Sequence, residues 1–290
     1  MKALSLAVLT SFYNSCMTFL DMLATAERQN NSMLCVGLDP EPTRFPGKFK
    51  GDSNKIYDFC AAIVDATADL AIAFKPQIAY FAAHRAEGQL ERLMEHIRRI
   101  APQVPIILDA KRGDIGSTAE QYAVEAFERY GADAVTLSPF MGHDSVAPYL
   151  KYPGKGAFLL CRTSNPGGDD LQNQRLAGHA GEPRLYEHIA RLAQESWNSN
   201  GQLGLVVGAT YPAEIERVRA LAPTLPMLIP GVGAQGGDAV ATVMAGRTAH
   251  GMIVVSSSRA ILYASSGDDF TQAARTEAVR TRDVLQAARR

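Results

Sequence analysis

The sequence has few residues that could cross-link the chain through disulfides or metals. Its 290 residues include four cysteines, Cys16, Cys35, Cys60 and Cys161, and no two of them have metal-ligand spacing. A chain of this length can bury a large core without disulfides, so we expect reduced thiols. There is no H-x-H motif, C-x-x-C motif or carboxylate cluster. The sequence therefore predicts no metal site.

An excess of charge of one sign is also missing. Lys and Arg number 29 against 30 Asp and Glu, for a net charge of −1. Surfaces that bind nucleic acid or anionic membranes need a basic excess, so we expect neither partner. No apolar run approaches the length of about 20 residues that a membrane span requires. A small anionic ligand remains possible, because it needs only a local group of cations.

The N-terminus resembles a weak signal peptide without its cleavage site. One lysine precedes a short apolar run within residues 1–10, but no A-x-A-like site follows. A second methionine, Met17, begins what looks like an ordinary first helix. We expect residues 1–16 to be an extension, disordered or upstream of the true start. Residues 17–290 should form one catalytic domain in the cytoplasm.

The rest of the chain alternates between short apolar runs and longer amphipathic segments. The runs lie at residues 34–39, 70–75, 105–111, 134–138, 157–162, 203–208, 227–231 and 252–256. They are mostly continuous, as in strands buried on both faces. Clear helical segments lie between them, at residues 58–67, 87–100, 117–130, 184–196, 212–222 and 238–245. Eight alternations predict a single (β/α)8 TIM barrel rather than an open doubly wound sheet.

Charged residues gather at the end of the third run. Asp109 and Lys111 alternate with Ala110 and therefore face the same side. Active sites of this barrel lie at the C-terminal ends of its strands. Asp114 follows a glycine turn, and acids on both sides of a lysine keep it protonated and able to donate a proton. A structural ion pair that caps the strand would give the same pattern.

The second run ends in Lys75, which needs a partner if it is buried. The neighbouring third strand would supply Asp109. We therefore expect an alternating array of charges that runs through Lys75, Asp109, Lys111 and Asp114.

The glycine-rich segment 231–238 predicts a phosphate site. Its four glycines expose backbone N–H groups, and a helix is expected to begin near Asp238. Phosphate sites on this fold form after strands seven and eight. Arg259 follows the eighth run and offers a planar set of donors suited to phosphate. A plain glycine-rich turn is the alternative.

The pattern Asp109-x-Lys111-x-x-Asp114-Ile115-x-x-Thr118 resembles the D-x-K-x-x-D-I-x-x-T signature of orotidine 5′-phosphate decarboxylases. Further segments resemble the family in the same order: Gly37-Leu38-Asp39, Phe74-Lys75, Thr163-Ser164-Asn165-Pro166-Gly167, residues 206–210, residues 230–238 and Ser258-Arg259-Ala260-Ile261. The resemblance spans about residues 33–263 and is closest to the longer bacterial subgroup, type 2. One departure is Ser258, where many members have glycine.

The resemblance implies a reaction and a set of roles. Orotidine 5′-phosphate would lose CO2 from C6 and become uridine 5′-phosphate, in de novo pyrimidine biosynthesis, without metal or cofactor. Lys111 would stabilise the carbanion and deliver the proton. Asp109 would lie beside the departing carboxylate, and Lys75 and Asp114 would position the lysine. The implied substrate ligands are Asp39, Thr118, Ser164, Gly231, Gly233, Gln235 and Arg259.

The resemblance also implies a homodimer in which Asp114 and Thr118 reach into the partner's site. Read without the family, Asp39 and Ser164 could equally cap turns, and Thr118 could be an ordinary residue in the first turn of a helix. Three other functions stay open. One is a Mg²⁺-dependent barrel lyase or synthase similar to hexulose-phosphate synthase. The others are a Schiff-base aldolase that uses Lys75 or Lys111, and an inactive barrel that only binds nucleotides.

Overall fold

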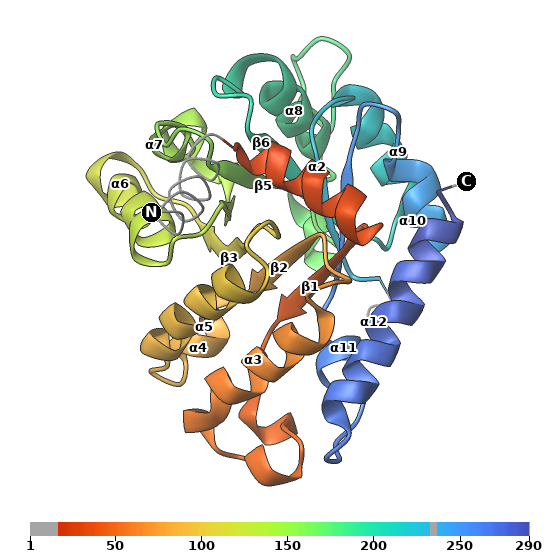
Figure 1. The fold of residues 1–290 in the computed structure, drawn as a ribbon. Helices are drawn as coiled ribbons and strands as arrows, with labels where there is room; N and C mark the ends of the chain where they lie inside the picture. Colours follow the sequence, from red (N-terminus) through yellow and green to blue (C-terminus); the bar gives the residue numbers. More distant parts are fainter. Residues whose placement is uncertain (1–16, 233–236, 290) are drawn as a thin grey trace, which may run out of the picture.

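The computed structural model describes residues 17–232 and 237–289, whose strands form a closed parallel barrel (Figure 1). The strands are β1 (Leu34–Leu38), β2 (Ala73–Pro76), β3 (Ile107–Arg112), β4 (Ala134–Leu137), β5 (Gly156–Arg162), β6 (Leu203–Val207), β7 (Met227–Pro230) and β8 (Ile253–Ser257). Their order is β2-β1-β8-β7-β6-β5-β4-β3. The two end strands meet through parallel bridges, Phe74 to Ile106 and Gln77 to Asp109. The predicted TIM barrel is confirmed.

Helices follow every strand and surround the barrel (Figure 1). They are α2 (Phe19–Asn30), α3 (Ile56–Thr67), α4 (Ile78–Ala82), α5 (Glu87–Ile100), α6 (Gly116–Val124), α7 (Ala147–Leu150), α8 (Leu185–Leu192), α9 (Pro212–Leu221), α10 (Ala239–Gly246), α11 (Arg259–Leu262) and α12 (Phe270–Ala287). The helices predicted at residues 117–130 and 184–196 each end in a π-helical turn, Glu125–Arg129 and Ala193–Trp197. The other four predicted helices end within two residues of those observed.

Most strand residues of the barrel are buried, and β3 becomes exposed only toward its C-terminal end. Every residue of β1, β4, β6 and β8 is buried, which explains why the runs do not alternate with polar residues. Helix α2, red in Figure 1, closes the N-terminal end of the barrel. The ring of Phe19 packs edge-on against Phe158 at 5.7 Å, and Gly156 has no room for a Cβ beside that ring. The opposite end is therefore the one left for a ligand.

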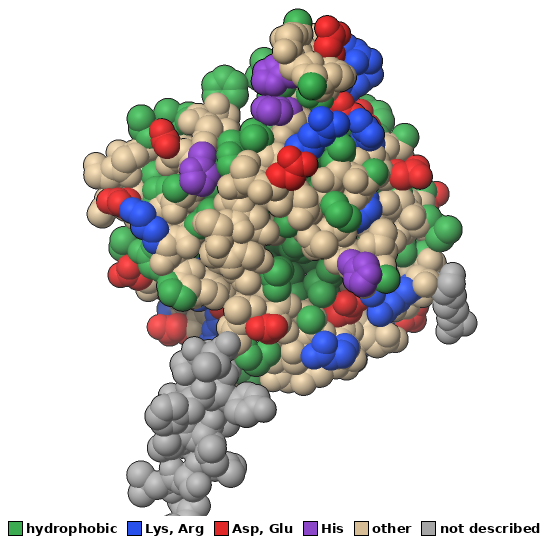
Figure 2. Space-filling model, turned by 90° about the horizontal axis from the view of Figure 1, so that it is seen from above, with side chains coloured by type: hydrophobic (Ala, Val, Ile, Leu, Met, Phe, Trp, Pro, Cys, Tyr) green, Lys and Arg blue, Asp and Glu red, His purple; other side chains and the backbone are tan. Residues whose placement is uncertain are grey.

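Residues 1–16 lie outside the described residues, so the predicted boundary at Met17 stays a prediction. Within the described part, no helix has both the length and the apolar character needed to cross a membrane. On the face shown in Figure 2, Lys and Arg side chains are intermixed with Asp and Glu side chains in small groups. This distribution agrees with the nearly neutral sequence.

Candidate active site

A cavity of about 670 Å³ opens at the C-terminal ends of the strands. All eight strands, or the residues just after them, contribute to its wall. The polar lining residues are Asp39, Lys75, Gln77, Tyr80, Asp109, Lys111, Thr136, Thr163, Ser164, Asn165, Gln172, Ser256, Ser258 and Arg259. The cavity therefore lies where the barrel fold places its active sites.

Three of the four predicted catalytic residues form one charged cluster, Lys75, Asp109 and Lys111, at the ends of β2 and β3. The ammonium of Lys75 lies 2.9 Å from Oδ2 of Asp109, and the ammonium of Lys111 lies 2.6 Å from Oδ1. Lys75 and Asp109 are buried, whereas the side chain of Lys111 is 47% exposed. Asp109 thus joins a buried lysine to one that reaches the cavity.

Thr136 on β4 fixes this arrangement and was missed from the sequence. Its hydroxyl donates to Oδ1 of Asp109 at 2.9 Å and accepts the backbone N–H groups of Ala110 and Lys111 at 3.1 and 3.0 Å. These bonds replace the regular ladder, whose register shifts between Leu108 and Arg112. Lys111 itself has φ +46°, which is uncommon for a residue other than glycine. In the sequence, the one sign of this role is a residue with a hydroxyl group within an otherwise apolar run.

The charges of the cluster hold one another ionised. Burial alone would raise the pKa of Asp109, but the positive charges of Lys75 and Lys111 outweigh it and hold that pKa well below its usual range. Burial would lower the pKa of Lys75, but the negative charges of Asp109 and Asp39 reverse the effect and raise it above its ordinary value. Both groups therefore stay charged around neutral pH.

The fourth predicted catalytic residue, Asp114, lies apart from this cluster. Its carboxylate accepts the backbone N–H of Ile115 at 2.8 Å, and no ion pair joins it to Lys111 within the described residues. Thr118 is exposed on α6, and neither residue lines the cavity of its own chain. Ile115, between these two residues, is an exposed apolar side chain, and the segment after β4 exposes two more, Phe140 and Met141.

The predicted sugar and phosphate residues line the side of the cavity formed by β1, β7 and β8. Oδ1 of Asp39 is buried and has no hydrogen-bond partner among the residues that the structure describes, and the Asp39 carbonyl accepts the Tyr263 hydroxyl at 3.0 Å. Arg259 begins α11 with an exposed side chain. Gly231 has φ +102°, a conformation that favours glycine. Gly233 and Gln235 lie outside the described residues.

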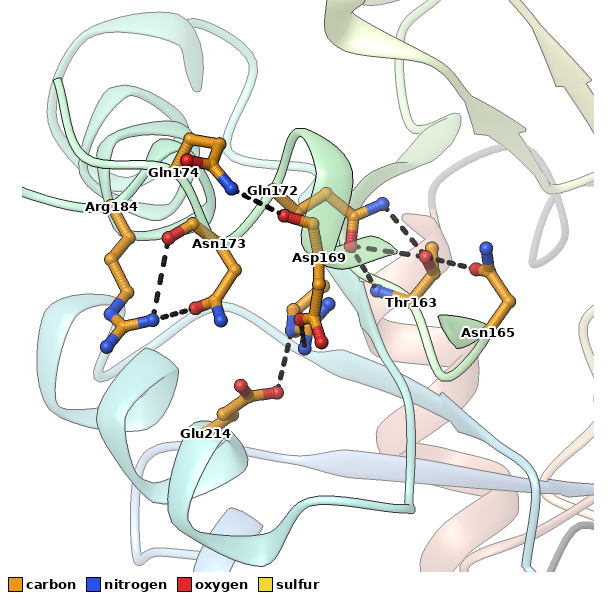
Figure 3. Close-up of polar contacts among 9 residues, drawn as sticks. Thr163, Asn165, Asp169, Gln172, Asn173, Gln174, Arg184 and Glu214 are labelled. Carbon is orange, nitrogen blue, oxygen red and sulfur yellow. Dashed lines mark hydrogen bonds and ion pairs between the residues drawn. The ribbon is translucent and has the colours of Figure 1, made fainter. Parts of the chain in front are cut away.

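The predicted base-binding residue, Ser164, lies in the loop after β5 and also lines the cavity. A Cβ at Gly208 would come within 2.7 Å of the Ser164 Cβ, so β6 approaches this loop closely. Polar contacts from the same loop surround Thr163 and Asn165 (Figure 3). Gln172, a member of this network, was also missed from the sequence.

Metal ligands do not gather in the described part of the chain. Across residues 17–232 and 237–289, there is no group of three or more His, Cys, Asp or Glu side chains placed to hold a metal ion. The absence of a metal and of a cofactor stays a prediction.

Comparison with known proteins identifies the family. The family model described as "Orotidine 5'-phosphate decarboxylase / HUMPS family" matches residues 32–275. The chain belongs to this family. It is 84% identical over 273 residues to an orotidine 5′-phosphate decarboxylase of Polaromonas naphthalenivorans, over 94% of this chain and 97% of that protein. A decarboxylase of Variovorax paradoxus is 78% identical over 94% of this chain and all of that protein.

Solved structures of the family have the same fold. The structure of Leishmania donovani OMP decarboxylase has a TM-score of 0.81 and 37% identity, and the match covers 94% of this chain and 99% of that one. Leishmania donovani UMP synthase has a TM-score of 0.79 and 38% identity over 93% of this chain and 57% of the longer protein. The family inferred from the D-x-K-x-x-D pattern is thereby confirmed.

Proposed function

We propose that the chain decarboxylates orotidine 5′-phosphate to uridine 5′-phosphate in pyrimidine biosynthesis. The observation that carries this proposal is the charged cluster at the mouth of the barrel. Its Lys111 is held at 2.6 Å from Asp109 and reaches the cavity. The decarboxylases that are 71–84% identical to the chain support the same reaction over a phosphosugar lyase.

The cluster accounts for both halves of the reaction. The C6 carboxylate of the substrate would lie beside Asp109, and as its bond to C6 breaks, CO2 leaves and the electron pair stays on C6. The Lys111 ammonium stabilises that charge and then gives its proton to C6, after which water reprotonates the amine. Lys75 holds Asp109 ionised from the buried side, so the charges are in place before the substrate binds.

The remaining cavity residues would bind the rest of the nucleotide. Arg259 and the backbone near Gly231 suit the phosphate, because a guanidinium and exposed N–H groups are strong phosphate donors. Asp39 suits the ribose hydroxyls, since its unpartnered Oδ1 needs a donor. Ser164 suits the pyrimidine on the β5 side. Contacts remote from C6 can also lower the barrier if they close loops around the substrate.

The test is the loss of orotidine absorbance when purified protein is added to orotidine 5′-phosphate with EDTA present. Turnover should be unaffected by the chelator. Turnover of a phosphosugar that requires Mg²⁺, with no loss of orotidine absorbance, would instead establish the lyase alternative. Trapping of a substrate adduct by borohydride would establish a Schiff-base aldolase.

We also propose a two-fold homodimer in the cytoplasm whose sites are shared between subunits. Asp114, in the loop after β3, and Thr118, in the first turn of α6, lie outside the cavity of their own chain. Ile115 is exposed between them, and Phe140 and Met141 are exposed in the segment after β4. Exposed apolar groups of this kind are typical of interfaces. In a symmetric dimer the same loop of each chain can contact the other, which would bring Asp114 to the partner's Lys111.

Mixing two inactive variants tests the shared site. In a mixed dimer of Lys111→Ala and Asp114→Ala, one site inherits both defects and the other has neither. Free subunit exchange should therefore restore about a quarter of wild-type activity. A mixture that stays inactive after mass spectrometry has confirmed exchange would show that Asp114 serves its own chain.

A further inference from the structure

The loop after β5 carries a directed chain of hydrogen bonds that ends at the cavity. Gln172 contacts Thr163, and Thr163 contacts Asn165 (Figure 3). All three residues line the cavity, and Thr163 and Asn165 flank Ser164 in the sequence. Nothing in the proposed reaction requires this chain, so its geometry calls for a separate explanation.

The chain has a fixed direction because it starts from a backbone N–H, which can only donate. The N–H of Thr163 donates to Oε1 of Gln172 at 2.8 Å, which turns Nε2 of Gln172 toward the Thr163 hydroxyl at 2.8 Å. The hydroxyl has one proton and two possible acceptors, Oε1 of Gln172 at 3.1 Å and Oδ1 of Asn165 at 2.6 Å. The shorter contact takes the proton. Because the Asn165 oxygen is then occupied, its amide nitrogen is the free end, and it points away from Thr163 (Figure 3).

A buried arginine holds the loop after β5, which carries the hydrogen-bond chain, in place. Arg162, the last residue of β5, has a side chain only 3% exposed and pairs with Asp169 at 2.6 Å and with Glu214 at 2.7 Å. Asp169 belongs to the loop and Glu214 to α9, so the two ion pairs of Arg162 connect the loop to that helix. The Asp169 carbonyl also accepts Nε2 of Gln174 at 2.8 Å. Gln172 itself is held through its backbone: its N–H donates to the Gly168 carbonyl at 2.8 Å, and its carbonyl accepts the Tyr186 N–H at 3.0 Å.

We propose that Gln172 is a positioning residue that sets the base specificity of the cavity. By fixing the direction of the chain, it makes Asn165 present N–H donors to the ligand. Such an end can donate to the C4 carbonyl of a uracil-type ring, whereas a cytosine-type ring has an amino group, itself a donor, at that position; the C2 carbonyl is common to both rings. This inference rests on the proposed function, because it takes the ligand to be a pyrimidine nucleotide.

This role of Gln172 requires the edge of the base that carries C4 to face Asn165, while C6 faces Lys111 across the same cavity. The phosphate residues follow β7 and β8, and Lys111, which would face C6, is on β3. In a pyrimidine, N3 lies across the ring from C6, with a carbonyl on each side in uracil. Cytosine has an amino group in place of one carbonyl and a lone pair at N3. We take the N3–C4 edge, which lies away from C6, to face the loop after β5, where the donor lies.

The test reverses the direction of donation along the hydrogen-bond chain while keeping side chains of nearly the same shape. In Gln172→Glu, the carboxylate still accepts the Thr163 N–H but cannot donate, so the Thr163 hydroxyl must turn its proton to the carboxylate. The Asn165 amide then has to donate to that hydroxyl and presents its oxygen to the cavity. The measurement is the ratio of the inhibition constants of cytidine monophosphate and uridine monophosphate. We expect the preference for the uridine nucleotide to fall about tenfold, the size of one net hydrogen bond that is lost.

The protein offers a matched control at another place on its surface. Gln194 holds Thr224 through the same pattern, with Oε1 facing the Thr224 N–H at 3.4 Å and Nε2 donating to the hydroxyl at 3.0 Å. Neither residue lines the cavity. Gln194→Glu adds the same negative charge and should leave the ratio unchanged. The ratio also cancels the repulsion that a new carboxylate exerts on both phosphates.

A second variant changes Asn165, the last residue of the hydrogen-bond chain. Asn165→Asp keeps an acceptor for Thr163 and places an oxygen where the N–H group was, so it should lower the ratio in the same direction. A merely structural role for Gln172 would weaken both nucleotides equally. If both variants do so with an unchanged ratio, the inference is wrong. Failure of the wild-type protein to turn over orotidine 5′-phosphate would instead contradict the proposed function, while the ratio could still be measured by binding.

Discussion

The two sides of the cavity are built in opposite ways. On the β2–β3 side, the charged cluster is bonded within the chain: Asp109 accepts from Lys75, Lys111 and Thr136, and both Asp109 and Lys75 are buried. On the β7–β8 side, Arg259 is exposed, and no ion pair involves its guanidinium within the described residues. Under the proposed function, the charges that act on the transition state are paired before the substrate binds, whereas the charge that binds the phosphate is left unpaired until the ligand arrives.

The largest effect should come from the cavity end of the cluster. Lys111→Ala removes the proton donor and the charge that opposes the carbanion, so turnover should fall by more than the 10²–10⁴-fold that is typical for a lost general acid. The side chain is half-exposed, so the fold should survive. Turnover is measured by orotidine absorbance, with circular dichroism as the control for folding. Near-normal turnover in a folded variant would show that Lys111 is not the proton donor.

The open side of the cavity should respond in binding rather than in chemistry. Arg259→Ala removes charge-assisted hydrogen bonds to phosphate, so the preference for uridine monophosphate over uridine should fall about 10–100-fold. Turnover falls as well only if phosphate binding closes the site. The measurement compares inhibition by the two ligands in both proteins. A variant with wild-type preference would show that another group binds the phosphate.

A smaller effect on turnover should come from Thr136, which holds Asp109 of the charged cluster in place. Thr136→Val keeps the shape of the side chain but removes the bond to Asp109 and the acceptor for the backbone N–H groups of Ala110 and Lys111. We expect the turnover number to fall about tenfold with little change in KM, because the lysine is displaced rather than lost. Thr136→Ser keeps the hydroxyl and should restore most of the activity. Equal losses in both variants would assign the effect to packing.

The smallest effect is a change in acid sensitivity. The pKa of Asp109 is lower in the folded chain than in the unfolded one, so its contribution to stability is complete above the unfolded value of about 4 and is lost progressively as the pH falls from there toward the folded value. Asp109→Asn should be less stable at neutral pH but lose less on acidification. Chemical unfolding from pH 7 to pH 3 at one protein concentration measures this. Parallel curves for the two proteins would contradict the shift.

The sequence was enough to predict those site residues whose position follows from the order of the strands. Lys75 and Asp109 end consecutive parallel strands, so the order of the strands alone predicts their contact. Thr136 could not be distinguished, because threonine in a buried strand also serves as an ordinary strand former. Gln172 could not be placed either, since the irregular loop after β5 has no periodic pattern to show which residues turn back on one another.

The closure of the barrel at β2 and β3 has a consequence for how the protein can change. These strands meet through isolated bridges rather than a continuous ladder, and the ion pair from Lys75 to Asp109 spans the same junction. A side-chain contact of the reaction site therefore does part of the work that backbone hydrogen bonds do at the other seven junctions. Substitutions that alter the chemistry at Lys75 or Asp109 also weaken the seam of the barrel. New activities could be gained more safely in the loops after β5 and β7, where changes leave that seam intact.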